Sequence, residues 1–390
     1  MNIRFLIMFL VILGILIGFH VLLYFSFIRF FSISSELVKN ILLVTLGVLS
    51  VSFIFSVLFA RFSNFILVRA FYFISAFWLG ALFYIIVATI LIFILILVFK
   101  HFGIDAKLPA SIIVYALTFV YLLLSVWNAM NPVVKNVSVK IRNLPDYWQG
   151  KTIVQLSDVH LGKINGPRFA RRMVEKVNNL NPDLILITGD LFDGMGVAPN
   201  NFLEILNNLK SKDGVYYVSG NHEYYLGHDM ILDYLKKETN MEVIDNKIVE
   251  IEGLQIVGIG YPGYGQNGDR SDIINKIGGY NSEKPSILLY HEPTSINQDA
   301  QDQSHSYLSP KTDFSYQKEQ GVDLQISGHT HAGQFFPFNI ITKKIFKGYY
   351  YGLFTEGDFN LYVTSGTGTW GPPIRNVVKS EIVNFNLEKK

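Results

Sequence analysis

The 390-residue chain has no cysteine, which excludes disulfide bonds, thiolate catalysis and metal binding through sulfur. Any metal must therefore be bound by His, Asp, Glu or Asn side chains. The net charge is only +2, and residues 131–390 carry more acidic than basic side chains. Because nucleic-acid binding needs a basic surface, this charge balance gives no support to a nucleic-acid partner.

Charge is also scarce in the first third of the chain. Only nine charged side chains occur in residues 1–130, and four long uncharged runs lie between them. About 20 apolar residues are enough to cross a bilayer as a helix. We therefore expect a transmembrane region over residues 1–130, with four spans at 5–28, 40–60, 70–99 and 110–130. A cleaved signal peptide is the alternative for the first run, and a buried helical core is the alternative for all four.

Four spans place the N-terminus and residues 131–390 on the same side of the membrane. Basic residues near spans favour the cytoplasmic side. If the N-terminus is inside, the inner flanks hold Arg4, Arg61, Arg69, Lys135, Lys140 and Arg142, and the outer flanks hold Arg29, Lys39, Lys100 and Lys107. This excess of basic residues on the inner flanks predicts a multi-pass protein of the plasma membrane whose soluble part is cytoplasmic.

The soluble part has the alternation of an α/β protein. Asn131-Pro132 ends the last span, and residues 131–150 form a linker with a first strand at 133–141. Strand-like and helix-like segments then alternate up to residue 237, and strand-like segments dominate after residue 242. The polar stretch 297–319 is expected to be a long surface loop, either a lid or a disordered excursion. The main domain is thus predicted over residues 151–390.

Five short blocks in this domain carry oxygen and nitrogen donors, and each follows a strand-like run. They are Asp158-Val159-His160, Gly189-Asp190, Gly220-Asn221-His222-Glu223, Tyr290-His291 and Gly328-His329-Thr330-His331. In open α/β sheets, ligands bind beyond the carboxyl ends of the strands. We therefore expect these blocks to converge on one site with enough donors for two divalent ions.

The order and content of these blocks resemble the calcineurin-like metallophosphoesterase family over roughly residues 150–375. The strings 157–162 and 328–334 resemble a branch that includes transmembrane metallophosphoesterases and UDP-2,3-diacylglucosamine hydrolase-like proteins. The resemblance implies an α/β sandwich of two central mixed β-sheets flanked by helices. The predicted architecture is therefore a four-helix transmembrane region followed by this sandwich.

The resemblance also implies a role for each block. Asp158, His160 and His331 would hold one metal, Asn221, His291 and His329 would hold the other, and Asp190 would bridge them. The cofactors are then two divalent ions such as manganese, iron or zinc. Metal-activated water would attack phosphorus. His222 would act as a catalytic residue beside Asp190 by protonating the leaving oxygen.

Three further residues have open alternatives. Glu223 either orients a neighbouring histidine or contacts substrate, or it is a solvated loop acid. Arg375, which follows a glycine-rich segment at 365–371, either contacts a phosphate oxygen or only shapes the turn. Trp370 is either a wall of the cleft or part of the core.

These features predict a membrane-anchored, metal-dependent phosphoric ester hydrolase. Its substrate would be a phosphodiester or pyrophosphate, and a lipid-linked substrate such as UDP-2,3-diacylglucosamine is plausible beside membrane lipids. One alternative is a phosphomonoesterase acting on a soluble ester or a phosphoprotein. Another is a non-catalytic, metal-bound membrane scaffold or sensor.

Overall fold

The structure is a computed structural model that describes residues 3–63, 65–194, 200–262, 270–297 and 308–390. The chain divides into two compact units, each described here by itself. One contains Met1–Val126 with Gly371–Ile374, and the other contains Trp127–Trp370 with Arg375–Lys390.

The first unit is helical. Its helices are α1 (Ile3–Phe30), α2 (Glu36–Phe62), α3 (Ile66–His101) and α4 (Lys107–Met130), and α4 continues into the second unit. All four are long and apolar enough to cross a membrane. Leu23, Leu46 and Leu82 pack together inside this unit, whereas most large apolar side chains of the helices are exposed. Such exposure is expected of helices that face lipid.

The second unit is a sandwich of two mixed six-stranded sheets. The first sheet has the order β1-β12-β2-β3-β4-β5, and the second has the order β10-β11-β9-β8-β7-β6. The first-sheet strands are β1 (Val133–Ile141), β2 (Thr152–Leu156), β3 (Leu184–Thr188), β4 (Val215–Val218), β5 (Glu242–Val243) and β12 (Glu381–Lys389). The second-sheet strands are β6 (Lys247–Ile251), β7 (Leu254–Ile259), β8 (Ser286–Tyr290), β9 (Leu324–Ser327), β10 (Gly352–Glu356) and β11 (Phe359–Val363).

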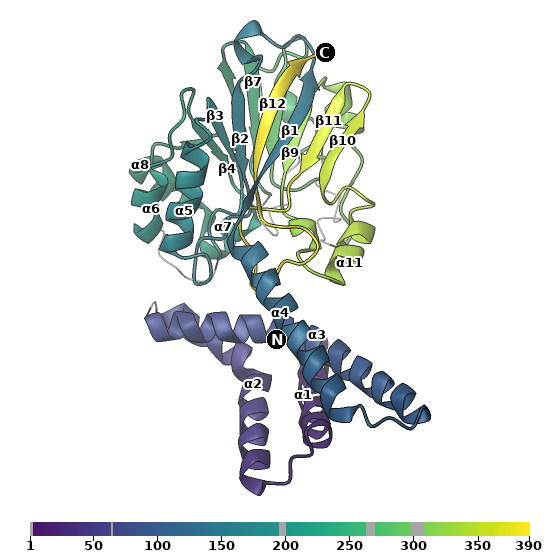
Figure 1. Cartoon of the computed structure of the whole chain (residues 1–390). Helices are drawn as coiled ribbons and strands as arrows, with labels where there is room; N and C mark the ends of the chain where they lie inside the picture. The colour runs from purple at the N-terminus through teal and green to yellow at the C-terminus, as the bar shows by residue number, and fades with distance from the viewer. Residues whose placement is uncertain (1–2, 64, 195–199, 263–269, 298–307) are drawn as a thin grey trace. The chain divides into compact units, whose positions relative to one another are not determined.

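Helices cover the outer faces of the sandwich. Helices α5 (Pro167–Asn178), α6 (Asn200–Leu206) and α8 (His228–Glu238) pack on the first sheet (Figure 1). Helices α9 (Ile273–Ile277) and α10 (Ser315–Glu319) pack on the second. The remaining helices are η1 (Asp146–Trp148), α7 (Asn221–Leu226), η2 (His331–Gly333) and α11 (Phe338–Ile345). The predicted fold class, apolar helices followed by a two-sheet α/β sandwich, is confirmed.

The inward faces of the two sheets form the central core. Ile153 and Leu184 of the first sheet meet Ile287 and Leu324 of the second in one buried cluster. Each of the strands β2, β3 and β8 has apolar side chains on both faces because a helix layer covers its other side. Strand β9 differs, because Leu324 and Ile326 face the central core and the polar Gln325 and Ser327 lie on the other face.

Two segments differ from the sequence-based expectation. The stretch 297–319 was expected to be a surface loop, but residues 315–319 form α10, in which Tyr316 and Gln317 are buried. Residues 298–307 of that stretch lie outside the described residues. Strand β12 was not predicted, and it lies between β1 and β2 in the first sheet.

Candidate metal centre

In each of the five donor blocks, the first expected ligand lies just beyond the carboxyl end of a strand. Asp158 follows β2, Asp190 follows β3, Asn221 follows β4, His291 follows β8 and His329 follows β9. Strands β2, β3 and β4 run parallel in one sheet, and β7, β8 and β9 run parallel in the other. Parallel strands bring their carboxyl ends to one edge, so blocks far apart in the sequence become neighbours.

The first group of donors contains Asp158, His160 and His331. The Nε2 atoms of His160 and His331 are 3.0 Å apart, and His331 Nε2 is 3.4 Å from Asp158 Oδ1. Ser157 Oγ and the His329 backbone N–H both donate to the Asp158 carboxylate. The carboxylate is therefore fixed in direction before any ion is bound.

The second group contains Asp190, His291 and His329, with Asn221 beside them. Asn221 Oδ1 is 3.1 Å from His291 Nε2 and 3.0 Å from His329 Nδ1. His291 Nε2 is also 3.1 Å from Asp190 Oδ2. Because His291 Nδ1 lies 2.8 Å from the Thr188 carbonyl, which can only accept, its Nε2 is the ring atom that faces the other donors.

Asp190 lies between the two groups. Its Oδ2 atom is 3.1 Å from His291 Nε2 of the second group and 3.8 Å from His160 Nε2 of the first. Its other oxygen, Oδ1, accepts the backbone N–H of His222 at 2.8 Å. One carboxylate oxygen is thus held by the chain, and the other faces both groups.

The charges of these groups suit the binding of cations. Burial holds the pKa of His160 and His331 well below the ordinary range and lowers that of His329 to about 3, so all three rings are neutral ligands. Burial also lowers the pKa of His291, but the Asp190 carboxylate outweighs it and raises the value to about 10. In the chain alone, a proton on His291 therefore provides the positive charge that a metal would supply, and the donor set fits a divalent ion.

His222 is oriented towards Asp190. Its Nδ1 lies 2.9 Å from the Asp193 carbonyl oxygen, so Nδ1 donates and Nε2 is the free ring atom. That Nε2 is 4.0 Å from Asp190 Oδ2. The exposed ring of Trp370 lies 6.0 Å from the His222 ring, so Trp370 stands beside the candidate site and is not part of the core.

Glu223, a candidate for substrate contact, binds the protein backbone in the structure. This side chain is fully buried, and its carboxylate accepts backbone N–H groups of Asp190, Leu191, Phe192 and Gly220. No part of it is open to a substrate. Glu223 instead ties the loop after β3 to the start of α7, where unpaired N–H groups need an acceptor.

Arg375, the other candidate for substrate contact, also binds the protein backbone in the structure. Its side chain is fully buried, and its guanidinium donates to the backbone carbonyls of His331, Ser365 and Gly368. Nη2 also lies 3.1 Å from His331 Nδ1. Burial lowers the pKa of Arg375 to about 10, which leaves the group charged at neutral pH. In the structure, Arg375 therefore supports the ligand loop through these carbonyl groups.

Two acidic residues beside the site were not identified from the sequence. Asp193 Oδ1 is 3.9 Å from His160 Nδ1, and its backbone carbonyl orients His222. Glu292 Oε1 is 3.4 Å from His329 Nε2, on the side of the ring opposite Nδ1. Both residues stand next to recognised blocks, so the pairs Asp190-x-x-Asp193 and His291-Glu292 were available signals.

Five of the seven expected ligands have a left-handed backbone. Asp158, His160, Asp190, His329 and His331 all have φ between 48° and 67°. Residues other than glycine rarely adopt this conformation, and Asp and His tolerate it better than most. The sharp turns point successive donors into one site, and backbone strain of this kind is common at functional sites.

Two glycines of the blocks are required by close contact. A Cβ on Gly328 would overlap the Asp158 carboxylate and Ser157 Oγ, and a Cβ on Gly220 would overlap the Asp190 carboxylate. The groups that approach them are the expected ligand side chains themselves.

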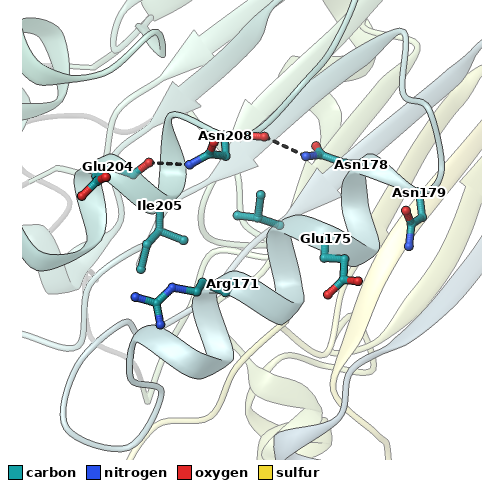
Figure 2. A pocket seen from close by; sticks show the side chains of 8 residues that line it. Arg171, Glu175, Asn178, Asn179, Glu204, Ile205 and Asn208 are labelled. Carbon is teal, nitrogen blue, oxygen red and sulfur yellow. Dashed lines mark hydrogen bonds between the residues drawn. The ribbon is translucent and has the colours of Figure 1, made fainter.

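A separate hollow lies between α5 and α6 (Figure 2). Arg171, Glu175 and Glu204 are among the residues that line it, and Asn178 Nδ2 donates to the Asn208 carbonyl at its edge. None of its lining residues belongs to the five donor blocks. The hollow is therefore distinct from the metal centre.

The sequence comparisons agree with this geometry. Residues 151–333 match the family described as calcineurin-like phosphoesterase. An uncharacterized metallophosphoesterase of Campylobacter jejuni is 37% identical over 283 residues, which cover 72% of this chain and 69% of that protein. One from Helicobacter pylori is 38% identical over 257 residues, which cover 64% of each protein.

A transmembrane protein with a metallophosphoesterase domain from Danio rerio is 32% identical over 296 residues, covering 72% of this chain and 62% of that protein. The chain thus spans about two thirds of the length of these curated relatives. The family resemblance seen in the five blocks is confirmed. The chain belongs to the calcineurin-like metallophosphoesterase family.

Proposed function

We propose that this chain is a membrane-anchored phosphoesterase that binds two divalent ions and hydrolyses a phosphodiester or pyrophosphate bond by attack of water. The position of Asp190 carries the proposal, because Oδ2 is 3.8 Å from His160 Nε2 and 3.1 Å from His291 Nε2. A carboxylate in this position can bridge two ions ~3.5–4 Å apart.

Each group of donors then binds one ion. Asp158, His160 and His331 hold the first, Asn221, His291 and His329 hold the second, and Asp190 is shared. When bound, the two ions would lower the pKa of a water molecule and offset the negative charge of the phosphate. The chain contributes the positions of the ligands and a dry, buried surrounding in which these charges act strongly.

His222 supplies the proton for the leaving oxygen. Its Nδ1 is committed to the Asp193 carbonyl, so the proton that it gives is held on Nε2, which faces Asp190. Water adds its oxygen to phosphorus as the bond from phosphorus to the leaving oxygen breaks. The leaving oxygen takes the His222 proton, and a proton from the attacking water restores it.

The substrate class follows from the anchor. Four apolar helices keep the domain at a membrane, which favours a lipid-linked phosphoester such as UDP-2,3-diacylglucosamine. We propose that residues 1–130 form a transmembrane region, residues 131–150 a linker with the first strand, and residues 151–390 the catalytic domain. The catalytic domain would lie on the cytoplasmic side of the plasma membrane. Protease accessibility in sealed vesicles would test this orientation.

The decisive experiment uses the full chain in detergent with added Mn²⁺. Bis-p-nitrophenyl phosphate, p-nitrophenyl phosphate and UDP-2,3-diacylglucosamine are compared as substrates, and bound metal is measured per chain. We expect two ions per chain and hydrolysis of a diester or pyrophosphate, with both lost in Asp190→Asn. Faster hydrolysis of the monoester would favour a phosphomonoesterase. Two bound ions without hydrolysis of any substrate would favour a scaffold or sensor.

A further inference from the structure

Helix α11 exposes large apolar side chains, although it belongs to a compact domain. Phe338, Ile340 and Ile341 are 51%, 57% and 49% exposed, respectively. Thr342 and the following Phe346 are buried and attach the helix to the domain. A helix that covered only the domain core would turn its apolar side chains inward, so this exposed set needs another explanation.

The exposed apolar surface continues into a second segment of the same unit. Gln334 and Trp370 exchange two hydrogen bonds of 3.1 Å, and the Phe336 N–H donates to Asn376 Oδ1 at 3.1 Å. These bonds join the segment before α11 to the residues around Trp370 and Val377. We call the whole set the α11 surface, and it consists of Phe336, Phe338, Ile340, Ile341, Trp370 and Val377.

The charged residues in the α11 segment are all basic. Lys343, Lys344 and Lys347 are all exposed, and residues 335–351 contain no Asp or Glu. An apolar surface with lysines and no acidic residue in its own segment matches a phospholipid bilayer with anionic headgroups. Tryptophan is also common at the depth of lipid headgroups.

We propose that the α11 surface lies in the interface of a bilayer, with its apolar side chains among the upper acyl chains and its lysines at anionic headgroups. A bilayer is favoured over another protein because the same chain has four helices able to cross one. It is favoured over a second copy because pairing this surface with itself would bring lysines together. The inference rests on the proposed membrane anchoring and does not depend on hydrolysis.

The α11 surface is joined directly to the metal centre. The backbone of Asn339 lies against Gly333, where a Cβ would overlap it, and Gly333 is only two residues beyond His331. At the other end of α11, the Phe346 ring is 6.1 Å from the His329 ring. Trp370, which belongs to the surface, lies beside His222. A surface embedded in lipid would therefore open the site towards headgroup phosphates.

Because the chain has no cysteine, single cysteines can carry a nitroxide label without background. Ile341→Cys reports on the α11 surface, Ile94→Cys reports on exposed α3, and Glu283→Cys reports on an exposed position before β8, at the opposite end of that strand from His291. The full chain is reconstituted in vesicles of phosphatidylcholine and phosphatidylglycerol in equal parts. Collision rates with oxygen, which enters lipid, and with a nickel chelate, which stays in water, give the immersion of each label.

We expect the oxygen-to-nickel ratio at Ile341→Cys to exceed that at Glu283→Cys severalfold and to approach that at Ile94→Cys. A ratio at Ile341→Cys equal to that at Glu283→Cys, with Ile94→Cys immersed, would overturn the inference alone. Low collision rates with both reagents at Ile341→Cys would indicate a protein partner or second copy and would also overturn it. If Ile94→Cys is not immersed, the proposed membrane anchoring itself fails.

Substitution of the lysines gives an independent test of the contact with anionic headgroups. In the Ile341→Cys background, Lys343→Gln with Lys344→Gln should lower the ratio in vesicles that contain phosphatidylglycerol and leave it unchanged in pure phosphatidylcholine. The matched control is Lys236→Gln with Lys237→Gln, two exposed lysines on α8. An equal change from both lysine pairs would show that the effect is not local to α11 and would contradict the role given to Lys343 and Lys344.

Discussion

The two halves of the metal centre are supported by buried side chains of opposite charge, and each of these side chains binds backbone groups of the ligand loops. In the half built on the first sheet, Glu223 is a buried acid that accepts backbone N–H groups of the loops after β3 and β4. In the half built on the second sheet and the segment before β12, Arg375 is a buried base that donates to backbone carbonyls around His331. The charge of each support follows from the backbone groups that its loops leave unpaired.

The halves also supply different ligands. Both expected carboxylate ligands, Asp158 and Asp190, come from the first sheet, whereas the second sheet supplies only imidazoles, from His291, His329 and His331. Carboxylates can bridge ions, and a neutral imidazole binds one ion. Loss of the shared carboxylate Asp190 should therefore affect both ions, and loss of a single imidazole from the second sheet should affect one.

The largest expected effect tests that difference directly. Asp190→Asn removes the shared carboxylate, and we expect loss of both ions and a fall of hydrolysis to the rate without protein. His329→Gln should lose one ion per chain and keep the other. Metal content measured on gel-filtered protein separates the two results. Equal loss of metal in both variants would mean that the two ions bind only as a pair.

His222→Ala leaves every expected ligand in place and removes the proton donor. We expect kcat to fall about 10²–10⁴-fold, the usual contribution of a general acid. The metal content should remain that of the unmodified chain. A fall in metal content would instead place His222 among the ligands, where its Nε2, 4.0 Å from Asp190 Oδ2, could reach an ion.

The two buried supports should act mainly on stability. Glu223→Gln places an NH₂ group among backbone donors, and Arg375→Met leaves carbonyls without donors. Each change should lower the free energy of unfolding by about 3 kcal/mol, because a buried partner of a charged group is left unsatisfied. Thermal unfolding of the full chain in detergent, with metal removed, measures this. If only one variant is destabilised, the two supports are not equivalent.

Glu292→Gln should weaken metal binding without lowering stability, because Glu292 lies beside the His329 ring, whereas Glu223 and Arg375 bind the backbone. Glu292 Oε1 lies 3.4 Å from His329 Nε2, so loss of its charge should weaken the ion held by His329 about 10-fold or more. The thermal midpoint of the metal-free chain should change little. Titration with Mn²⁺ gives the affinity, and Glu250→Gln at an exposed position on β6 is the matched control.

The smallest effect lies away from the site. Burial opposes ionisation of Asp183, but the Thr152 N–H and Lys151 outweigh it and hold the pKa of Asp183 below its ordinary value. The stabilisation is therefore present above the unfolded pKa of about 4 and is lost as pH falls through the lower folded value. Asp183→Asn should cost about 1 kcal/mol at pH 7. The difference in the free energy of unfolding between Asp183→Asn and the unmodified chain should disappear at acidic pH. Denaturant unfolding at several pH values measures this difference.

The sequence predicted the features that depend on local pattern. Charge-free runs located all four apolar helices, and apolar runs followed by Asp, Asn or His located β2, β3, β4, β8 and β9 with their donors. Such patterns are local because a strand or a span is recognised from its own residues. The family resemblance then supplied the two-sheet sandwich.

The burial of Glu223 and Arg375 could not be predicted in this way. Both are charged residues in glycine-containing loops, which is equally typical of substrate contacts. Their partners are backbone atoms brought close by tertiary folding, and the sequence has no signal for them. Strand β12 did have a signal, since Val383, Phe385 and Leu387 alternate and are buried. Its parallel partner β1 lies at the other end of the domain.

The left-handed turns at Asp158, His160, Asp190, His329 and His331 have a consequence for protein engineering. Glycine would adopt each of these conformations with less strain, which for other residues is on the order of 1–3 kcal/mol. A search for heat-resistant variants would therefore tend to replace the proposed metal ligands. Such a search should select for bound manganese at the same time as it selects for survival at high temperature.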